Sequence, residues 1–289
     1  MKLLRFESGH GIRIGVLDGE TVYDLTAAGP GFSDWARAYE DAGSLEGLVA
    51  SVERAKRTSR KVPYDYRTLR APFVPSEIWA AGVTYLRSRE ARETETKLKG
   101  LYDYVYSAVR PELFLKDSGL RCVGPGDPVC VRGDSKWSVP EPELSVVLDA
   151  KFRVVGYTVG NDVSSRDIEG ENPLYLPQAK VYRGSSAIGP VVTTADEVPQ
   201  PRALEIRMRI VRGSEAVFEG SVNTSQLKRE VDELVGYLRR SNVIRTFTVL
   251  MTGTSLVPPD DFTLTGGDVV EIEIEKIGTL RNPVEQLRA

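Results

Sequence analysis

Three carboxylates near the middle of the chain have the spacing of a metal site. Glu141 and Glu143 stand two residues apart at the start of a strand-like run, and the period of a strand places both side chains on one face. A turn centred near Ala150 follows, so the next segment should return antiparallel and bring Asp162 beside Glu141. Because Pro142 donates no backbone hydrogen bond, we expect this strand to start at a sheet edge or a bulge.

Such a cluster predicts a particular kind of ion. Carboxylates held together repel one another, which raises their proton affinity unless a cation lies among them. Ligation by oxygen alone suits a hard ion, so Mg²⁺ is the first choice, with Mn²⁺ or Ca²⁺ as alternatives. A bare Glu-x-Glu pair also occurs on solvated strand faces, and the spacing alone leaves that interpretation open.

Few other residues are available for chemistry. The single histidine, His10, lies in a glycine-flanked turn between two strand-like runs, where a solvated side chain is expected. The two cysteines, Cys122 and Cys130, are too few for a disulfide framework or a four-cysteine metal site, and we expect reduced structural thiols. Acid, base and ligand roles should therefore fall to carboxylates, lysine, tyrosine or serine.

Composition and charge exclude several classes of protein. The chain has 289 residues, of which 41% are hydrophobic and 27% charged, the balance of a soluble globular protein. A net charge of −3 without a strongly basic block argues against a nucleic-acid partner. No stretch has the length and apolarity of a signal-peptide core or a membrane span, so we expect a cytoplasmic protein.

The first part of the chain alternates strand and helix patterns. Strands are expected over 3–6, 12–17 and 21–25, and helices over 32–43 and 44–57. Two prolines between residues 70 and 75 then indicate a boundary. We therefore expect a small N-terminal α/β domain at 1–72 and a larger domain at 73–289.

The larger part is dominated by strand patterns from about residue 112 to 280. One amphipathic helix is predicted over 224–241, capped by Thr224 or Ser225. Another helix, over 86–99, is nearly all charged or polar, so it should be a solvated arm or a mobile lid. The pattern as a whole predicts an α+β fold.

Four segments, in this order and spacing, resemble the fumarylacetoacetate hydrolase family: PEPELSVVL, GNDVSSRD, QAKVYRGSSAIGP and LMTGTSLV. The resemblance covers residues from about 75 to 289. It implies a mixed β-roll catalytic domain beside the small N-terminal domain, in a homo-oligomer such as a dimer or tetramer. It implies a metal site formed by Glu141, Glu143 and Asp162, and a keto-acid substrate site formed by Lys180, Arg166, Gly253 and Thr254.

One departure from the family pattern bears on the reaction. Members that cleave carbon–carbon bonds usually carry a histidine and a glutamate where Ser88 and Ala91 stand here. Serine cannot activate water without its own base, so hydrolysis by such a pair is not expected. The segments YDYVYSAVRPELFLK and EGENPLYLPQAKVY resemble instead the subgroup of 2-keto-3-deoxy-D-arabinonate dehydratases, whose active-site glutamate falls on Glu112.

The subgroup implies a substrate and a mechanism. The substrate would be a five-carbon 2-keto-3-deoxy sugar acid, named after arabinonate or xylonate by origin, and the product 2,5-dioxopentanoate on an oxidative pentose route. Mg²⁺ would polarise the ketone and acidify the C3 protons. Lys180 is the candidate base and Glu112 the candidate acid, with the two roles exchangeable. Tyr85 and the charged helix after it would close over the substrate.

Alternatives stay open for several of these residues and for the reaction. Glu112 also fits a helix start after Pro111, Lys180 a surface loop, and Gly253 with Thr254 an ordinary β-turn. The functional alternatives are a hydrolase or decarboxylase of a 2,4-diketo or 2-keto acid, and a non-catalytic keto-acid binder.

Overall fold

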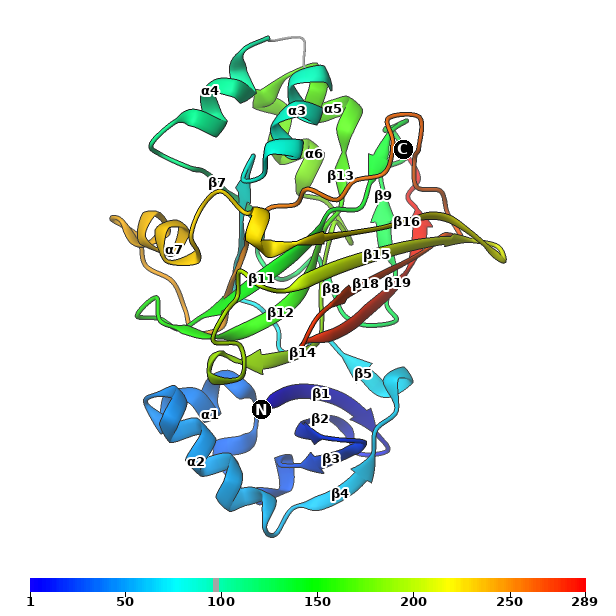
Figure 1. Ribbon diagram of the computed structural model, residues 1–289. Coiled ribbons are helices and arrows are strands. Elements are labelled where there is room, and N and C mark those ends of the chain that lie inside the picture. The colour runs from blue at the N-terminus through cyan, green and yellow to red at the C-terminus, as the bar shows by residue number, and fades with distance from the viewer. Residues whose placement is uncertain (96–98) are drawn as a thin grey trace.

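The computed structural model describes residues 1–95 and 99–289, so residues 96–98 of the predicted charged helix lie outside the described part. The N-terminal part is a meander of strands flanked by two helices, as predicted (Figure 1). Its elements are β1 Lys2–Ser8, β2 Gly11–Asp18, β3 Thr21–Asp24, β4 Arg60–Pro63, β5 Leu69–Arg70, α1 Trp35–Ala42 and α2 Leu45–Lys56. Asp34 and Ser44 cap the helices by accepting hydrogen bonds from the backbone N–H groups of Arg37 and Gly47.

A twelve-stranded mixed sheet runs through both parts of the chain. Its path is β4-β3-β2-β1-β14-β12-β11-β17-β6-β7, with β5 beside β1 and β8 beside β14. The antiparallel pair of β1 and β14 joins the N-terminal meander to the rest. The further strands are β6 Ile78–Gly82, β7 Glu112–Asp117, β8 Cys122–Val123, β11 Pro142–Leu148, β12 Val154–Asp162, β14 Ser186–Thr194 and β17 Thr248–Met251.

A second sheet packs against the middle of the first. Its order is β16-β15-β18-β19-β9, and its strands are β9 Val129–Val131, β15 Glu205–Arg212, β16 Glu215–Asn223, β18 Val269–Ile274 and β19 Gly278–Gln286. In β15 the residues Ile206, Met208 and Ile210 are buried while their neighbours face outward, the alternation of a strand with one wet face. The buried set packs with Leu144 and Val146 of β11 in one core.

The other face of β11 is covered from the N-terminal part. Trp35, Tyr39 and Leu48 of α1 and α2 share a second core with Val147 of β11 and Val249 of β17. Because both of its faces are covered, every residue of β11 is buried, and after Glu143 the strand is apolar except for Ser145.

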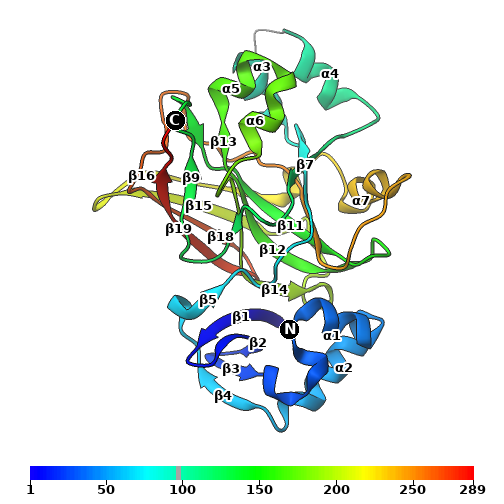
Figure 2. The ribbon, with the colours of Figure 1, turned by 180° about the vertical axis from the view of Figure 1, so that it is seen from behind.

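A group of short helices lies at the end of the large sheet opposite the N-terminal part (Figures 1 and 2). They are α3 Leu86–Glu95, α4 Leu101–Ser107, α5 Arg166–Glu171 and α6 Leu176–Lys180. The two-stranded sheet of β10 Ser138–Val139 and β13 Ser164–Ser165 leads into α5, and α7 Val231–Arg239 lies to one side. Single 3₁₀ turns occur at Thr26–Ala28, Pro30–Phe32, Tyr66–Thr68, Pro173–Tyr175, Ala195–Glu197 and Thr224–Gln226. No helix in the described ranges is long and apolar enough to cross a membrane.

One local prediction is wrong. The helix predicted from Thr224 begins at Val231, because the Thr224 hydroxyl instead accepts from the N–H of Leu204 and holds its segment against β15. The edge position expected for Pro142 is present locally: β11 as a whole lies between β12 and β17, but its pairing with β17 begins only at Ser145. The strand therefore has one unpaired side at Pro142, where a residue without an N–H is tolerated.

The turn between β11 and β12 is organised by Asp149, as the predicted hairpin requires. Its carboxylate accepts hydrogen bonds from the N–H groups of Lys151 and Arg153, both at 2.8 Å, and from the Tyr39 hydroxyl of α1 at 3.1 Å. Burial alone would raise the pKa of Asp149, but these bonds and the Arg153 guanidinium lower it. The ionised carboxylate therefore stabilises the folded chain above the pKa of the unfolded carboxyl, and this stability is lost as the pH falls.

We expect Asp149→Asn to lower the free energy of unfolding at pH 7 by about 1–3 kcal/mol, because charged hydrogen bonds are lost at a buried position. The difference from the wild type should shrink only below about pH 3.9, the ordinary pKa of an aspartate, as the native carboxyl with its lowered pKa takes up its proton. Urea unfolding at pH values from 7 down to about 2.5 measures this, with Tyr39→Phe as a milder variant that removes one bond. A difference that stays constant with pH would contradict the assignment.

Candidate active site

The hairpin of β11 and β12 brings the three predicted carboxylates together. Glu143 pairs with Gly160, and the N–H of Asp162 donates to the carbonyl of Glu141 at 3.0 Å, so the predicted return of Asp162 is confirmed. Glu141, Glu143 and Asp162 each offer an oxygen within 4.8 Å of the others. Their exposed fractions are 3%, 1% and 1%, which excludes the solvated-face interpretation.

Lys180, the last residue of α6, reaches into this cluster. Its Nζ lies 2.8 Å from Glu141 Oε2 and 3.0 Å from Asp162 Oδ2, and it donates to Ser164 Oγ at 2.5 Å. At 2% exposed it is not a surface lysine. Burial alone would lower the pKa of Lys180, but Asp162 and Glu141 outweigh burial and raise it. Among the protein groups alone the ammonium form is thus favoured.

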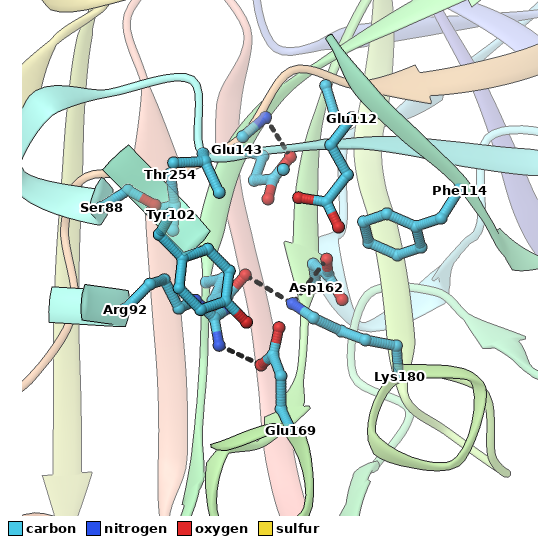
Figure 3. A pocket seen from close by; sticks show the side chains of 15 residues that line it. Ser88, Arg92, Tyr102, Glu112, Phe114, Glu143, Asp162, Glu169, Lys180 and Thr254 are labelled. Carbon is cyan, nitrogen blue, oxygen red and sulfur yellow. Dashed lines mark hydrogen bonds and ion pairs between the residues drawn. The ribbon is translucent and has the colours of Figure 1, made fainter. Parts of the chain in front are cut away.

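Two arginines meet the opposite oxygen of Glu141. Arg166, at the start of α5, and Arg92, in α3, each place Nη2 at 2.9 Å from Glu141 Oε1. Arg92 also forms an ion pair with the buried Glu169 of α5 (Figure 3). The sequence analysis missed Arg92 and Glu169. The α3 helix is therefore no solvated arm at this point, because its Arg92 is only 7% exposed.

The spacing of Ser88 and Arg92 is the sequence feature that could have shown which face of α3 carries Arg92 toward the site. Ser88 lies four residues before Arg92, so the two side chains share one side of α3, and both line the same cavity. The spacing is visible in the sequence, but only the packing of α3 over the hairpin shows that this side faces the carboxylates.

The carboxylates differ in how their charge is compensated. Burial would raise the pKa of Glu141, yet Lys180, Arg166 and Arg92 lower it below its ordinary value. For Glu143, burial and the charges of Asp162 and Glu141 raise the pKa well above the ordinary value. Its carboxylate accepts from the N–H of Gly253 at 2.6 Å, and no lysine or arginine in the described part lies within ion-pair distance.

A bound dication fits this arrangement. The buried, uncompensated Glu143 beside two other carboxylates is the environment in which a cation relieves repulsion, and the all-oxygen donor set suits Mg²⁺. Glu141, Glu143 and Asp162 would hold the ion, and Lys180 would share Glu141 and Asp162 with it.

Glu112 enters the cavity from β7, so the alternative of a helix start is wrong. It pairs with Gly82 of β6, and its Oε2 occupies the space of the missing side chain, since a Cβ on Gly82 would lie 2.1 Å from that oxygen. Burial and the nearby Glu169 raise the pKa of Glu112, outweighing Arg92 and Lys180. A carboxyl in this position is suited to hold and release a proton.

The remaining predicted residues surround the cluster less directly. Gly253 and Thr254 follow the end of β17 and line the cavity, but the Gly253 N–H is bonded to Glu143 and the Thr254 hydroxyl to the Leu256 backbone. Their contact with a substrate carboxylate therefore stays a prediction. Tyr85 is buried beside the site and is not among the residues lining the cavity, so its closing role also stays a prediction.

The cavity is narrow: about 20 Å³ is open to the centre of a water molecule, which is room for about one water molecule or one ion. Figure 3 shows Glu112, Glu143, Asp162 and Lys180 converging on one region, with Tyr102 and Arg92 on the near side. Its lining comprises Ala81, Gly82, Val83, Ser88, Arg92, Tyr102, Glu112, Phe114, Glu141, Glu143, Asp162, Glu169, Lys180, Gly253 and Thr254.

The fold and this site define a known class of enzyme. Residues 78–285 match the model of the fumarylacetoacetate (FAA) hydrolase C-terminal domain, and the chain belongs to this family. It is 49% identical over 268 residues to a probable 2-keto-3-deoxyxylonate dehydratase of Haloferax volcanii, covering 91% of this chain and 92% of that protein.

Two further similarities span the whole chain. A 2-dehydro-3-deoxy-D-arabinonate dehydratase of Saccharolobus solfataricus is 42% identical over 293 residues, covering 100% of this chain and 97% of that one. A solved structure of 2-keto-3-deoxy-D-arabinonate dehydratase, complexed with magnesium and 2,5-dioxopentanoate, superposes with a TM-score of 0.85 at 39% identity, with both chains fully covered. The resemblance stated from the sequence is thereby confirmed.

We expect Glu143→Gln to abolish Mg²⁺ binding without destabilising the metal-free chain, because it removes an uncompensated buried charge. For the wild type, Mg²⁺ at 100 times its Kd should raise the free energy of unfolding by about 2.7 kcal/mol. Thermal and urea unfolding with and without Mg²⁺ measure both effects, with Glu271→Gln on the second sheet as the control. A Mg²⁺-dependent stabilisation that survives in the Glu143 variant would remove this residue from the ligand set.

Gly82→Ala should reduce kcat by roughly 10²-fold or more, because the new methyl group displaces the Glu112 carboxyl from its position. The fold should survive, since the group that must move is the end of a flexible side chain. Gly236→Ala is the matched control: it lies on the exposed side of α7 with open space around it, and should add about 0.5–1 kcal/mol of stability at unchanged activity. Full activity of the Gly82 variant would show that the position of Glu112 does not matter.

Proposed function

We propose that this chain is a Mg²⁺-dependent dehydratase that converts 2-keto-3-deoxy-D-arabinonate, the five-carbon acid also named after xylonate, into 2,5-dioxopentanoate. The observation that carries the proposal is the meeting of Lys180 and Glu112 with three carboxylates in one small cavity. The similarity to dehydratases of this substrate over nearly the whole chain supports the same reaction.

The reaction removes a proton from C3 and a hydroxyl from C4, a net loss of one water. A bound Mg²⁺ would polarise the C2 ketone, acidify the C3 protons and offset the carboxylate charge that keeps Lys180 protonated. Lys180 takes the C3 proton, and the protonated Glu112 gives its proton to the departing C4 hydroxyl, which leaves as water, so that a C3–C4 double bond remains. The Glu112 carboxylate then takes a proton from C5 and Lys180 returns its proton to C3, which gives the enol of the C5 aldehyde and restores both side chains; the enol tautomerises to 2,5-dioxopentanoate. The opposite assignment, with Glu112 as base and the Lys180 ammonium as acid, uses the same two side chains.

The surrounding residues hold these two groups in place. Glu141 and Asp162 fix the Lys180 ammonium from one side and Ser164 from another. Arg92 and Arg166 pair with Oε1 of Glu141, which is the oxygen that Lys180 does not contact. Ser88 supplies no imidazole base to the cavity, which agrees with elimination of water and not with hydrolysis by a histidine.

Mg²⁺ assays with a panel of 2-keto-3-deoxy acids should give one product per substrate, lighter by one water and carrying a new aldehyde. Mass spectrometry identifies the product. Release of pyruvate would indicate carbon–carbon cleavage, and release of carbon dioxide a decarboxylase. Tight binding of pyruvate without turnover of any five- or six-carbon acid would indicate a non-catalytic binder.

Lys180→Met and Glu112→Gln should each lower kcat by about 10²–10⁴-fold, because each removes one of the proton-transfer groups. Glu112→Gln should leave Mg²⁺ affinity close to that of the wild type, since Glu112 is not among the three clustered ligands. Steady-state kinetics and titration calorimetry measure the two quantities. A Glu112 variant with full kcat would leave Lys180 as the only proton-transfer residue of this pair.

We also propose a cytoplasmic homo-oligomer, a dimer or tetramer, with the chain divided at 1–72 and 73–289. The free cysteines agree with a reducing compartment. The gap between the end of β5 at Arg70 and the start of β6 at Ile78 supports the division. Light scattering after size-exclusion chromatography measures the oligomeric state.

A further inference from the structure

Lys116 is a charged residue at the metal centre that the proposed reaction does not use. It lies on β7, where Glu112, Phe114 and Lys116 alternate with Leu113 and Leu115. Glu112 and Phe114 line the cavity, while Lys116 is behind them, 0% exposed and outside the lining. Leu115 on the other face is 47% exposed, so this strand turns a charge inward and an apolar side chain outward.

The Lys116 ammonium forms one ion pair and two hydrogen bonds. Its Nζ is 2.7 Å from Asp162 Oδ1, donates to the carbonyl of Val163 at 3.0 Å, and donates to the carbonyl of Lys180. These acceptors belong to the end of β12 and the end of α6, the two elements that carry a clustered carboxylate and the candidate base. One side chain thus connects the edge strand β7 to both functional elements.

Asp162 is held between two ammonium groups. Lys180, which lines the cavity, contacts Oδ2, whereas Lys116 contacts Oδ1 from the buried side. A ligand that competes with Lys180 for Asp162 does not have to displace Lys116. Burying a lysine is costly, and an apolar residue of similar volume is often neutral or stabilising at such places, so stability alone does not account for a charge here.

We infer that Lys116 is a positioning residue of the metal centre: it fixes the Asp162 carboxylate by one oxygen and, through the Lys180 carbonyl, helps to set the Lys180 side chain toward the cavity. Groups that orient a ligating carboxylate decide how closely a site matches the geometry of its ion. The inference rests on the metal site and not on the identity of the substrate.

Two dications separate positioning from charge. Loss of the Lys116 charge changes the attraction for Mg²⁺ and Ca²⁺ in the same sense, because both carry the same charge. Loss of positioning penalises Mg²⁺ more, since Mg²⁺ demands near-ideal octahedral geometry and Ca²⁺ accepts flexible ligands at longer distances. The ratio of the two dissociation constants therefore reports on positioning.

Titration calorimetry on the full chain should show that Lys116→Met raises the ratio Kd(Mg²⁺)/Kd(Ca²⁺) by about tenfold, within the range found for residues that orient metal ligands. Lys116→Gln, which keeps N–H donors for the two carbonyls, should raise the ratio in the same direction and serves where the methionine variant does not fold. Circular dichroism establishes which variants are folded.

Asn282→Leu is the matched control. Asn282 is 1% exposed on β19 and donates to the carbonyls of Gly124 and Asp127, so its loss leaves buried acceptors unpaired away from the metal centre. It should lower Tm and leave the ratio unchanged. A folded Lys116 variant that lowers Tm as Asn282→Leu does, with an unchanged ratio, would overturn the inference. Product formation by the wild type is scored separately and tests the dehydratase proposal.

Discussion

The site depends on keeping several negative charges buried at one end of a hairpin. Pairing of β11 with β12 brings Glu141 beside Asp162, and the spacing of a strand adds Glu143 on the same face. Buried carboxylates that stay ionised need cations to compensate their charge. Much of the surrounding structure supplies that compensation, because Lys180, Lys116, Arg92 and Arg166 come from four separate elements and converge on Glu141 or Asp162.

The compensation is uneven, and this unevenness has a chemical use. Glu141 is surrounded by cations on both oxygens, whereas Glu143 meets only a backbone N–H in the described contacts. The cluster therefore keeps one carboxylate whose charge is balanced only when an external cation is bound. A site built in this way couples the arrival of the metal to the state of Lys180, which shares two of the three ligands with it.

The scaffold around the hairpin explains how such a site stays in register. One face of β11 packs on the second sheet and the other on the helices of the N-terminal part, so the strand cannot shift by one residue without exposing its core side chains. Asp149 closes the turn by accepting hydrogen bonds from the N–H groups of Lys151 and Arg153 and from the Tyr39 hydroxyl of α1. The N-terminal part thus supports the catalytic hairpin although it contributes no residue to the cavity.

The spacing of residues was enough to predict the hairpin and its three carboxylates, since a strand period and a turn are short-range properties that can be inferred from the sequence alone. It was also enough for the meander and capped helices of the N-terminal part. The resemblance of four segments to the family then supplied Lys180, and the resemblance of a further segment to the dehydratase subgroup supplied Glu112; both residues lie outside the hairpin.

Tertiary structure alone decided the partners of these groups. Arg92 lies in a helix whose composition predicted a solvated position, and Lys116 lies on a strand where the lysine is buried while its neighbour Leu115 is 47% exposed. In both cases a charged side chain is buried where an apolar one is usual, because the buried carboxylates make a charged neighbour more favourable than an apolar one. Which charge meets which carboxylate depends on how distant elements pack, and no local pattern encodes that.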